Sequence, residues 1–175
     1  MLITLSPSKG QDFDSPVPST AHSKPKSLKE SELLIEELRK FKPRDIQELM
    51  SVSENIAELN AERYKSFKTP FTMNNAKQAI FAFKGDVYSG IAIDEYKDDD
   101  LDYAQDHLRI LSGLYGCLRP LDLIQPYRLE MKTKLQNPRG ENLYQFWGDR
   151  ITDELNEALE GQKEAVLINL ASNEY

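Results

Sequence analysis

The chain has 175 residues and a mass of 20.1 kDa, a size that favours one domain. Apolar residues make up 39% and charged residues 29%, so the chain can form a hydrophobic core and is not a disordered protein. The formal net charge of -7 excludes a globally basic protein that coats nucleic acid, and any anion site must therefore be a local patch.

The remaining composition narrows the class of protein further. Cys117 is the single cysteine and cannot form an internal disulfide, and His22 and His107 alone cannot supply a Cys/His zinc site. We see no signal peptide and no apolar run that approaches the roughly 18 residues of a membrane span. The sequence therefore predicts a cytoplasmic protein with no membrane partner, no metal and no cofactor.

The first third of the chain is predicted to be one strand followed by three helices. Residues 2–5 form a short apolar run with β-branched residues, and residues 10–27 read as a surface loop. Ser27 opens a capping-box pattern and a helix that Pro43 ends, and Pro43 can begin a second, short helix. Ser53 then begins the third helix.

The rest of the chain alternates between the two element types. Residues 79–83 (AIFAF) and 165–170 (AVLINL) are predicted as buried strands. Acidic residues at 98–100 suit the start of a helix, which we expect to stop at Ser112 and Gly113. Apolar residues every four positions predict one long amphipathic helix over 143–159. The expected fold is a single domain of the α+β class.

The sharpest local motif is the turn Leu111–Gly116, which has the pattern L-x-G-h-x-G of a helix-hairpin-helix, here over about residues 99–125. Two glycines allow a tight turn whose N–H groups can approach a phosphate. The segment 107–139 around it carries six basic and two acidic residues. The alternative is an ordinary helix C-cap followed by a glycine turn. The DNA-binding residues expected from this motif are Ser112, Gly113, Leu114, Tyr115, Gly116, Arg109 and Arg119.

Polar residues just after predicted strands form a second set of candidates. Lys9 and Lys84 follow the first and second predicted strands, and either lysine can bind a phosphate. Asp86 and Glu174 lie in the same kind of position and are candidates, with Lys9, for acid, base or nucleophilic catalysis. The alternative interpretation is a set of solvated loop residues and surface ion pairs.

Several segments together resemble the YaaA family of bacterial peroxide-stress proteins. The resemblance is carried by LSPSK (5–9), AIFAFKGDVYSG (79–90), HLRILSGLYGCLRPLDLIQPYRLEM (107–131), NLYQFWGD (142–149) and INLASNEY (168–175). Their order and spacing agree along essentially the whole chain. Members of the family extend beyond the last of these segments, so we expect this chain to lack a C-terminal region.

The resemblance implies a cytoplasmic DNA-binding protein of the response to hydrogen peroxide, associated with lowering free iron. It also implies a mixed α and β fold with a helix-hairpin-helix and a positively charged cleft. Carried over by position, the hairpin is Leu111 to Gly116, and the candidate cleft cations are Lys9, Lys84, Arg109, Arg119 and Arg128. Hairpin-bearing DNA glycosylases place an aspartate downstream of the hairpin, where this chain has Gln136 and Asn137.

Three functions follow from these observations. The leading hypothesis is a DNA-binding stress protein that contacts duplex or damaged DNA through backbone phosphates. The alternative is a glycosylase-like or nucleotide-acting enzyme that uses Lys9, Lys84, Asp86 and Glu174. The third is an iron-handling factor, although no helix pair carries the Glu-x-x-His pattern of iron-storage bundles.

Overall fold

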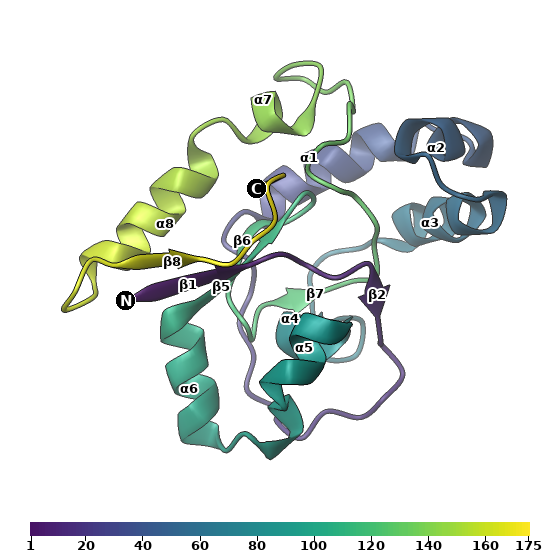
Figure 1. Ribbon diagram of the computed structural model, residues 1–175. Helices are drawn as coiled ribbons and strands as arrows, with labels where there is room; N and C mark the ends of the chain where they lie inside the picture. The colour runs from purple at the N-terminus through teal and green to yellow at the C-terminus, as the bar shows by residue number, and fades with distance from the viewer.

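A four-stranded sheet, built from segments far apart in the sequence, forms the centre of the molecule (Figure 1). In the computed structural model, which describes residues 1–175, β1 (Leu2–Leu5) lies between β5 (Leu108–Ser112) and β8 (Leu167–Asn169) and runs parallel to both. The fourth strand, β6 (Gly116–Leu118), pairs antiparallel with β5. The first predicted strand is confirmed at its expected residues, and it occupies a central position in the sheet.

Two pairs of very short strands form separate two-stranded sheets. β2 (Gly10–Gln11) pairs antiparallel with β4 (Phe83–Lys84), and β3 (Lys77–Gln78) pairs antiparallel with β7 (Leu123–Ile124). The first pair opposes Gly10 to Lys84. The segment that follows β1 is therefore held against β4.

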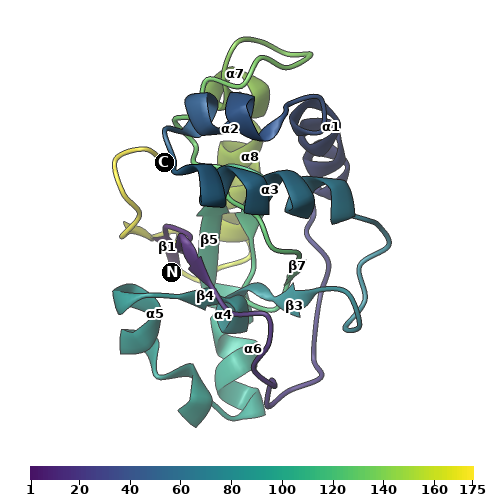
Figure 2. The same cartoon turned by 90° about the vertical axis from the view of Figure 1, so that its right-hand side faces the viewer.

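The helices form groups at different places around the sheet. The three predicted N-terminal helices are confirmed as α1 (Leu28–Leu38), α2 (Pro43–Met50) and α3 (Glu54–Ser66). Figure 2 shows them together at one end of the molecule, with α5 (Asp86–Ile91) and α6 (Asp98–His107) at the other end. No helix has the length and hydropathy that crossing a membrane requires.

One main hydrophobic core joins the helical layer to the sheet. It contains apolar residues of α1 and α3, the short helix α4 (Ala79–Ala82), and the inner side of the β5–β6 hairpin. Ile110 and Leu118 face each other across that hairpin, and both are fully buried in this core. The fold is thus a single compact α+β domain, as the sequence predicted.

The AIFAF segment is buried as predicted, but it is not one strand. Residues 79–82 form α4, and only Phe83 continues into a strand, β4. The N–H groups of Ala79 and Ile80 donate to the carbonyls of Asp122 and Pro120, at 2.9 Å each. A run of five apolar residues suits a buried helical turn as well as a buried strand, so periodicity alone could not separate the two.

The helix-hairpin-helix predicted for about residues 99–125 is not formed. The first helix, α6, ends at His107, and the chain continues directly as β5. After the turn it returns as β6, with Leu111 opposite Cys117, so the glycine motif is the turn of a β-hairpin. Pairing of β5 with β1 overrides the helical spacing of Leu108 and Leu111, which lie on opposite faces of the strand that actually forms.

Two further expectations are corrected at the C-terminal end. The long helix predicted over 143–159 is two helices, α7 (Leu143–Trp147) and α8 (Arg150–Glu160), separated at Gly148, whose φ is +51°. Glycine adopts this left-handed conformation easily, and it ends the first helix. The strand expected over 165–170 exists as β8 at the edge of the sheet, but it is not buried as predicted, because its side chains take no part in the main core.

Candidate functional site

Four segments from distant parts of the sequence meet beyond the carboxyl ends of β1 and β8. The hydroxyl of Ser8 donates a hydrogen bond to the carbonyl of Lys84, and the N–H of Ser172 donates to Ser6 Oγ at 2.7 Å. The N–H of Tyr127 donates to Gln11 Oε1 at 3.1 Å. Loops after parallel strands commonly form the binding site of a sheet, and here hydrogen bonds between side chains and backbone groups hold these loops together.

Three basic side chains surround one carboxylate in this region. Lys9 Nζ, Arg128 Nη2 and Lys132 Nζ each lie 3.2 Å from an oxygen of Glu130. Burial alone would raise the pKa of the Glu130 carboxyl, but its contacts with Lys9 and Lys132 outweigh burial and hold the pKa below its usual value. Glu130 therefore stays ionised, and the group as a whole keeps an excess of positive charge.

Two adjoining cavities open around this cluster. The small cavity, about 50 Å³, is lined by Lys9, Arg128 and Glu130 together with Glu174 and Tyr175. The large cavity, about 420 Å³, shares Lys9, Arg128 and Glu130. Lys132 and Lys134 also line the large cavity. The two cavities together form a basic depression, which we call the Arg128 site.

Two buried polar atoms at the Arg128 site have no hydrogen-bond partner in the protein. They are Arg128 Nε and the hydroxyl of Tyr175. The backbone carbonyl of Arg128 accepts a hydrogen bond from the hydroxyl of the buried Tyr64, which fixes this part of the chain. Since buried polar groups are nearly always paired, two unpaired groups in residues that line one cavity indicate a place for a polar ligand.

The predicted catalytic candidates are only partly brought together. Lys9 and Glu174 line the same small cavity, and burial and the nearby charge of Glu130 raise the pKa of the Glu174 carboxyl. Asp86 is exposed at the first turn of α5 and lines neither cavity. The structure thus joins Lys9 to Glu174 and leaves Asp86 outside.

Lys84 lines neither cavity of the Arg128 site, and its side chain is half exposed. Its Nζ is 3.9 Å from Asp12 Oδ2, while the buried Lys77 is 3.9 Å from the other oxygen of the same carboxylate. Hydrogen bonds from Ser15 are the main reason that the pKa of Asp12 is well below its usual value. Because Gly10 pairs with Lys84, the backbone of this lysine lies against the residue that follows Lys9.

The turn that was expected to contact DNA is part of the core. Ser112, Leu114 and Tyr115 are fully buried. The N–H groups of Leu114 and Tyr115 both donate to Ser112 Oγ, at 3.2 and 3.0 Å, and this oxygen also lies 2.7 Å from the hydroxyl of Tyr127. The amides that a phosphate would need are therefore already used inside the protein.

The two glycines of this turn serve close packing. A Cβ at Gly113 would lie 2.4 Å from the carbonyl oxygen of Leu129, and one at Gly116 would lie 2.7 Å from the ring of Trp147. Gly116 also has a φ of +73°. The indole N–H of Trp147 donates to the carbonyl of Gly113 at 2.9 Å, so the ring closes over the hairpin.

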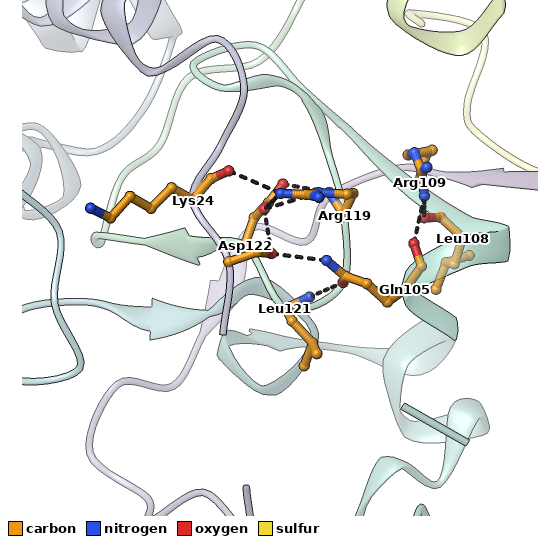
Figure 3. Close-up of polar contacts among 8 residues, drawn as sticks. Lys24, Gln105, Leu108, Arg109, Arg119, Leu121 and Asp122 are labelled. Carbon is orange, nitrogen blue, oxygen red and sulfur yellow. Dashed lines mark hydrogen bonds and ion pairs between the residues drawn. The ribbon is translucent and has the colours of Figure 1, made fainter. Parts of the chain in front are cut away.

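Arg109 and Arg119 line a different cavity, of about 450 Å³, which shares no lining residue with the Arg128 site. Figure 3 shows the guanidinium of Arg119 lying along the carboxylate of Asp122, at 2.9 Å, and contacting the carbonyl of Lys24. Arg109 Nη1 donates to the carbonyls of Gln105 and Leu108, at 2.9 and 2.7 Å. Both arginines thus hold neighbouring segments in place.

Cys117 lines the same cavity as the two arginines. Burial raises the pKa of its thiol to about 12, so the reactive thiolate is not formed near neutral pH. This agrees with its interpretation from the sequence as a small packed residue.

Four residues of the Arg128 site were not predicted as site residues from the sequence: Glu130, Lys132, Lys134 and Tyr175. The sequence did contain a signal for the first three. From Tyr127 to Leu135 every even-numbered residue is charged, whereas the odd-numbered residues are uncharged and are buried in the structure. Such alternation places charged side chains on one side of an extended segment. The charged residues of this row are Arg128, Glu130, Lys132 and Lys134.

Comparison with known protein families gives one result. The model of a family described as peroxide stress protein YaaA matches residues 1–175, the full length of the chain.

Proposed function

The chain belongs to the peroxide stress protein YaaA family, which implies a role in the response to peroxide stress, and we propose that it fulfils this role by binding DNA at the Arg128 site. The proposed interface is formed by Lys9, Lys84, Arg128, Lys132 and Lys134. These side chains meet the sugar–phosphate backbone, so binding depends little on base sequence and steeply on salt.

The observation that carries this proposal is the excess of cations around Glu130. The protein as a whole is acidic, with a net charge of -7, and yet three basic groups share this one carboxylate. A locally positive depression on an acidic protein attracts an anion at that place and repels it elsewhere. Lys9 and Lys132 are 63% and 67% exposed, so both can reach a phosphate outside the protein.

Fluorescence anisotropy with labelled duplex, mismatched and single-stranded DNA at two salt concentrations tests the proposal. We expect Lys132→Gln to weaken binding to every DNA and to reduce the salt slope by about one. Lys40→Gln is the matched control, because Lys40 is 65% exposed and also paired with a glutamate, Glu37, but lies on the helical layer. Equal affinities of the two variants would refute a DNA interface at this site.

Arg109 gives a second comparison within the same assay. Arg109→Gln should leave DNA affinity unchanged, because Arg109 lines another cavity and its Nη1 is used by two carbonyls. A larger loss from Arg109→Gln than from Arg128→Gln would move the interface to the cavity that Arg109 and Arg119 line.

An enzyme acting on a nucleobase or nucleotide is the second candidate, favoured by the raised pKa of Glu174 in the same cavity as Lys9. A carboxyl of this kind can donate and accept a proton nearer neutral pH. Incubation with damaged-base duplexes and with nucleotides, followed by chromatography, tests for turnover. Glu174→Gln should abolish any turnover and Asp86→Asn should not; turnover that survives Glu174→Gln excludes this role of Glu174.

The proposal also includes lower free iron, so that fewer hydroxyl radicals form at DNA. It predicts a lower ferrous pool in peroxide-treated cells that contain the protein than in cells that lack it. Calorimetry with ferrous iron in anaerobic buffer separates a direct effect, with stoichiometric binding, from an indirect one.

A further inference from the structure

We propose that the small cavity of the Arg128 site receives the terminal phosphomonoester of a DNA strand. This inference rests on the proposed function and names the part of DNA that this site selects. A terminal phosphate has three free oxygens and a charge of about −1.5 to −2 near neutral pH. An internal phosphodiester has two free oxygens, a single charge, and a sugar on each side.

Two unpaired polar groups in residues that line the cavity support a terminal phosphate. Arg128 Nε and the Tyr175 hydroxyl are both buried and have no partner in the protein. The Arg128 side chain is only 20% exposed. A strand end can direct an oxygen into such a recess, whereas the flanking sugars keep an internal phosphate at the surface. The terminal oxygens would then pair two groups that are otherwise left unsatisfied.

The charges in the same place match a dianion. Four basic residues line the two cavities, Lys9, Arg128, Lys132 and Lys134, against two carboxyl groups, those of Glu130 and Glu174. The excess of two positive charges balances the roughly two negative charges of a phosphomonoester. It exceeds the single negative charge of a phosphodiester. Charge-assisted contacts from a fixed guanidinium are also the strong class of phosphate contacts.

The sizes of the two cavities fit one end of a strand. The small cavity, about 50 Å³, has room for a single phosphate group and no room for a base. The adjoining large cavity, about 420 Å³, is in the size range of sites that hold a nucleotide-sized ligand. Because they share Lys9, Arg128 and Glu130, a phosphate in the first and its nucleoside in the second remain covalently connected.

Anisotropy with three short duplexes of one sequence tests the inference: one with 5′-phosphates, one with 3′-phosphates and one with hydroxyl ends. We expect the protein to bind one phosphorylated duplex about tenfold more tightly than the hydroxyl-ended duplex. Which of the two binds tightly identifies the strand end. Equal affinity for all three overturns the inference and leaves the proposed function standing, whereas no binding to any DNA overturns both.

Tyr175→Phe is the decisive variant, because it removes one hydroxyl and keeps the ring. We expect it to reduce the preference for the phosphorylated duplex several-fold and to leave binding of the hydroxyl-ended duplex unchanged. Tyr103→Phe is the control, since Tyr103 is 59% exposed on α6 and lines neither cavity. A full preference in Tyr175→Phe would contradict the assigned recess.

Discussion

Glu130 limits the positive charge that the Arg128 site offers to an anion. Its two oxygens lie 3.2 Å from three cations, and its side chain is 17% exposed. A phosphate that enters the site must compete with this carboxylate for the same donors. Glu130 therefore orders the basic side chains in the free protein and weakens their attraction for DNA.

The first prediction concerns this competition. Glu130→Gln should tighten DNA binding several-fold and steepen its salt dependence, because one negative charge leaves the centre of the interface. Glu141→Gln, at an exposed position outside both cavities, is the control for the change in net charge. Anisotropy titrations of both variants measure the effect; weaker binding by Glu130→Gln would mean that ordering of the cations matters more than competition.

The second prediction concerns pH. The folded-state pKa of Glu130 lies below its unfolded value, so its ion pairs stabilise the fold above the unfolded pKa, about 4.3, and this contribution disappears as the pH falls through the folded pKa. Glu130→Gln should be less stable than the wild type by a constant amount from pH 7 to about pH 5. The difference should shrink below about pH 4. Urea unfolding followed by Trp147 fluorescence measures it; a difference that persists unchanged at acid pH would contradict this role.

The β5–β6 hairpin is an element whose sequence motif serves packing. Ser112 satisfies the turn amides, Gly113 meets the carbonyl of Leu129, and Trp147 closes the outer side. The turn therefore connects the sheet to the segment that carries Arg128. The turn can therefore affect ligand binding by changing the position of the segment that carries Arg128.

The third prediction follows from this packing. Gly113→Ala should destabilise the protein by about 2–3 kcal/mol, because the new Cβ meets a backbone oxygen that cannot easily move. Gly90→Ala, where a Cβ would have open space within α5, should be neutral or slightly stabilising. Thermal unfolding compares the two. A Gly113→Ala protein of wild-type stability with impaired DNA binding would instead support a turn that contacts phosphate.

A helix or strand could be predicted from the sequence where residues close to it determine where it begins and ends. Pro43 and the carboxylate of Asp45, which accepts from the N–H of Lys42 at 2.9 Å, fix the start of α2 locally, and this helix was predicted correctly. The end of α6 at His107 is decided by the pairing of β5 with β1, more than 100 residues away in the sequence. No local pattern contains that information.

For the molecule as a whole, the positions just after predicted strands were the sequence feature that correctly indicated residues of the Arg128 site. Lys9 and Glu174 follow β1 and β8, and because parallel neighbours end at the same edge, the structure brings both to one cavity. Arg109 was assigned from the hairpin motif, and it lies elsewhere because the motif forms a different structure. Tyr175 could not be predicted, since its importance lies in a buried hydroxyl without a partner.

The fourth prediction concerns the exposed edge of the sheet. β8 is an edge strand, and Leu167 and Leu170 are 43% and 63% exposed. Exposed apolar edges favour association, so the chain should self-associate as its concentration rises, and Leu170→Lys should reduce this. Val87→Lys, at a 58% exposed position on α5, should not. Analytical ultracentrifugation decides; equal behaviour of the two variants would exclude this edge as the contact.

The central position of β1 has a consequence for the order of folding during synthesis. Ile3 aligns with Leu108 on one side and Ile168 on the other, so the sheet consists of long-range pairings of the kind that form slowly. A nascent chain that ends before residue 108 can form α1, α2 and α3, while β1 has neither neighbour. The loops that carry Lys9 and Glu174 can meet only after β8 has left the ribosome, so ligand binding is acquired late, once residues 167–174 have been synthesised.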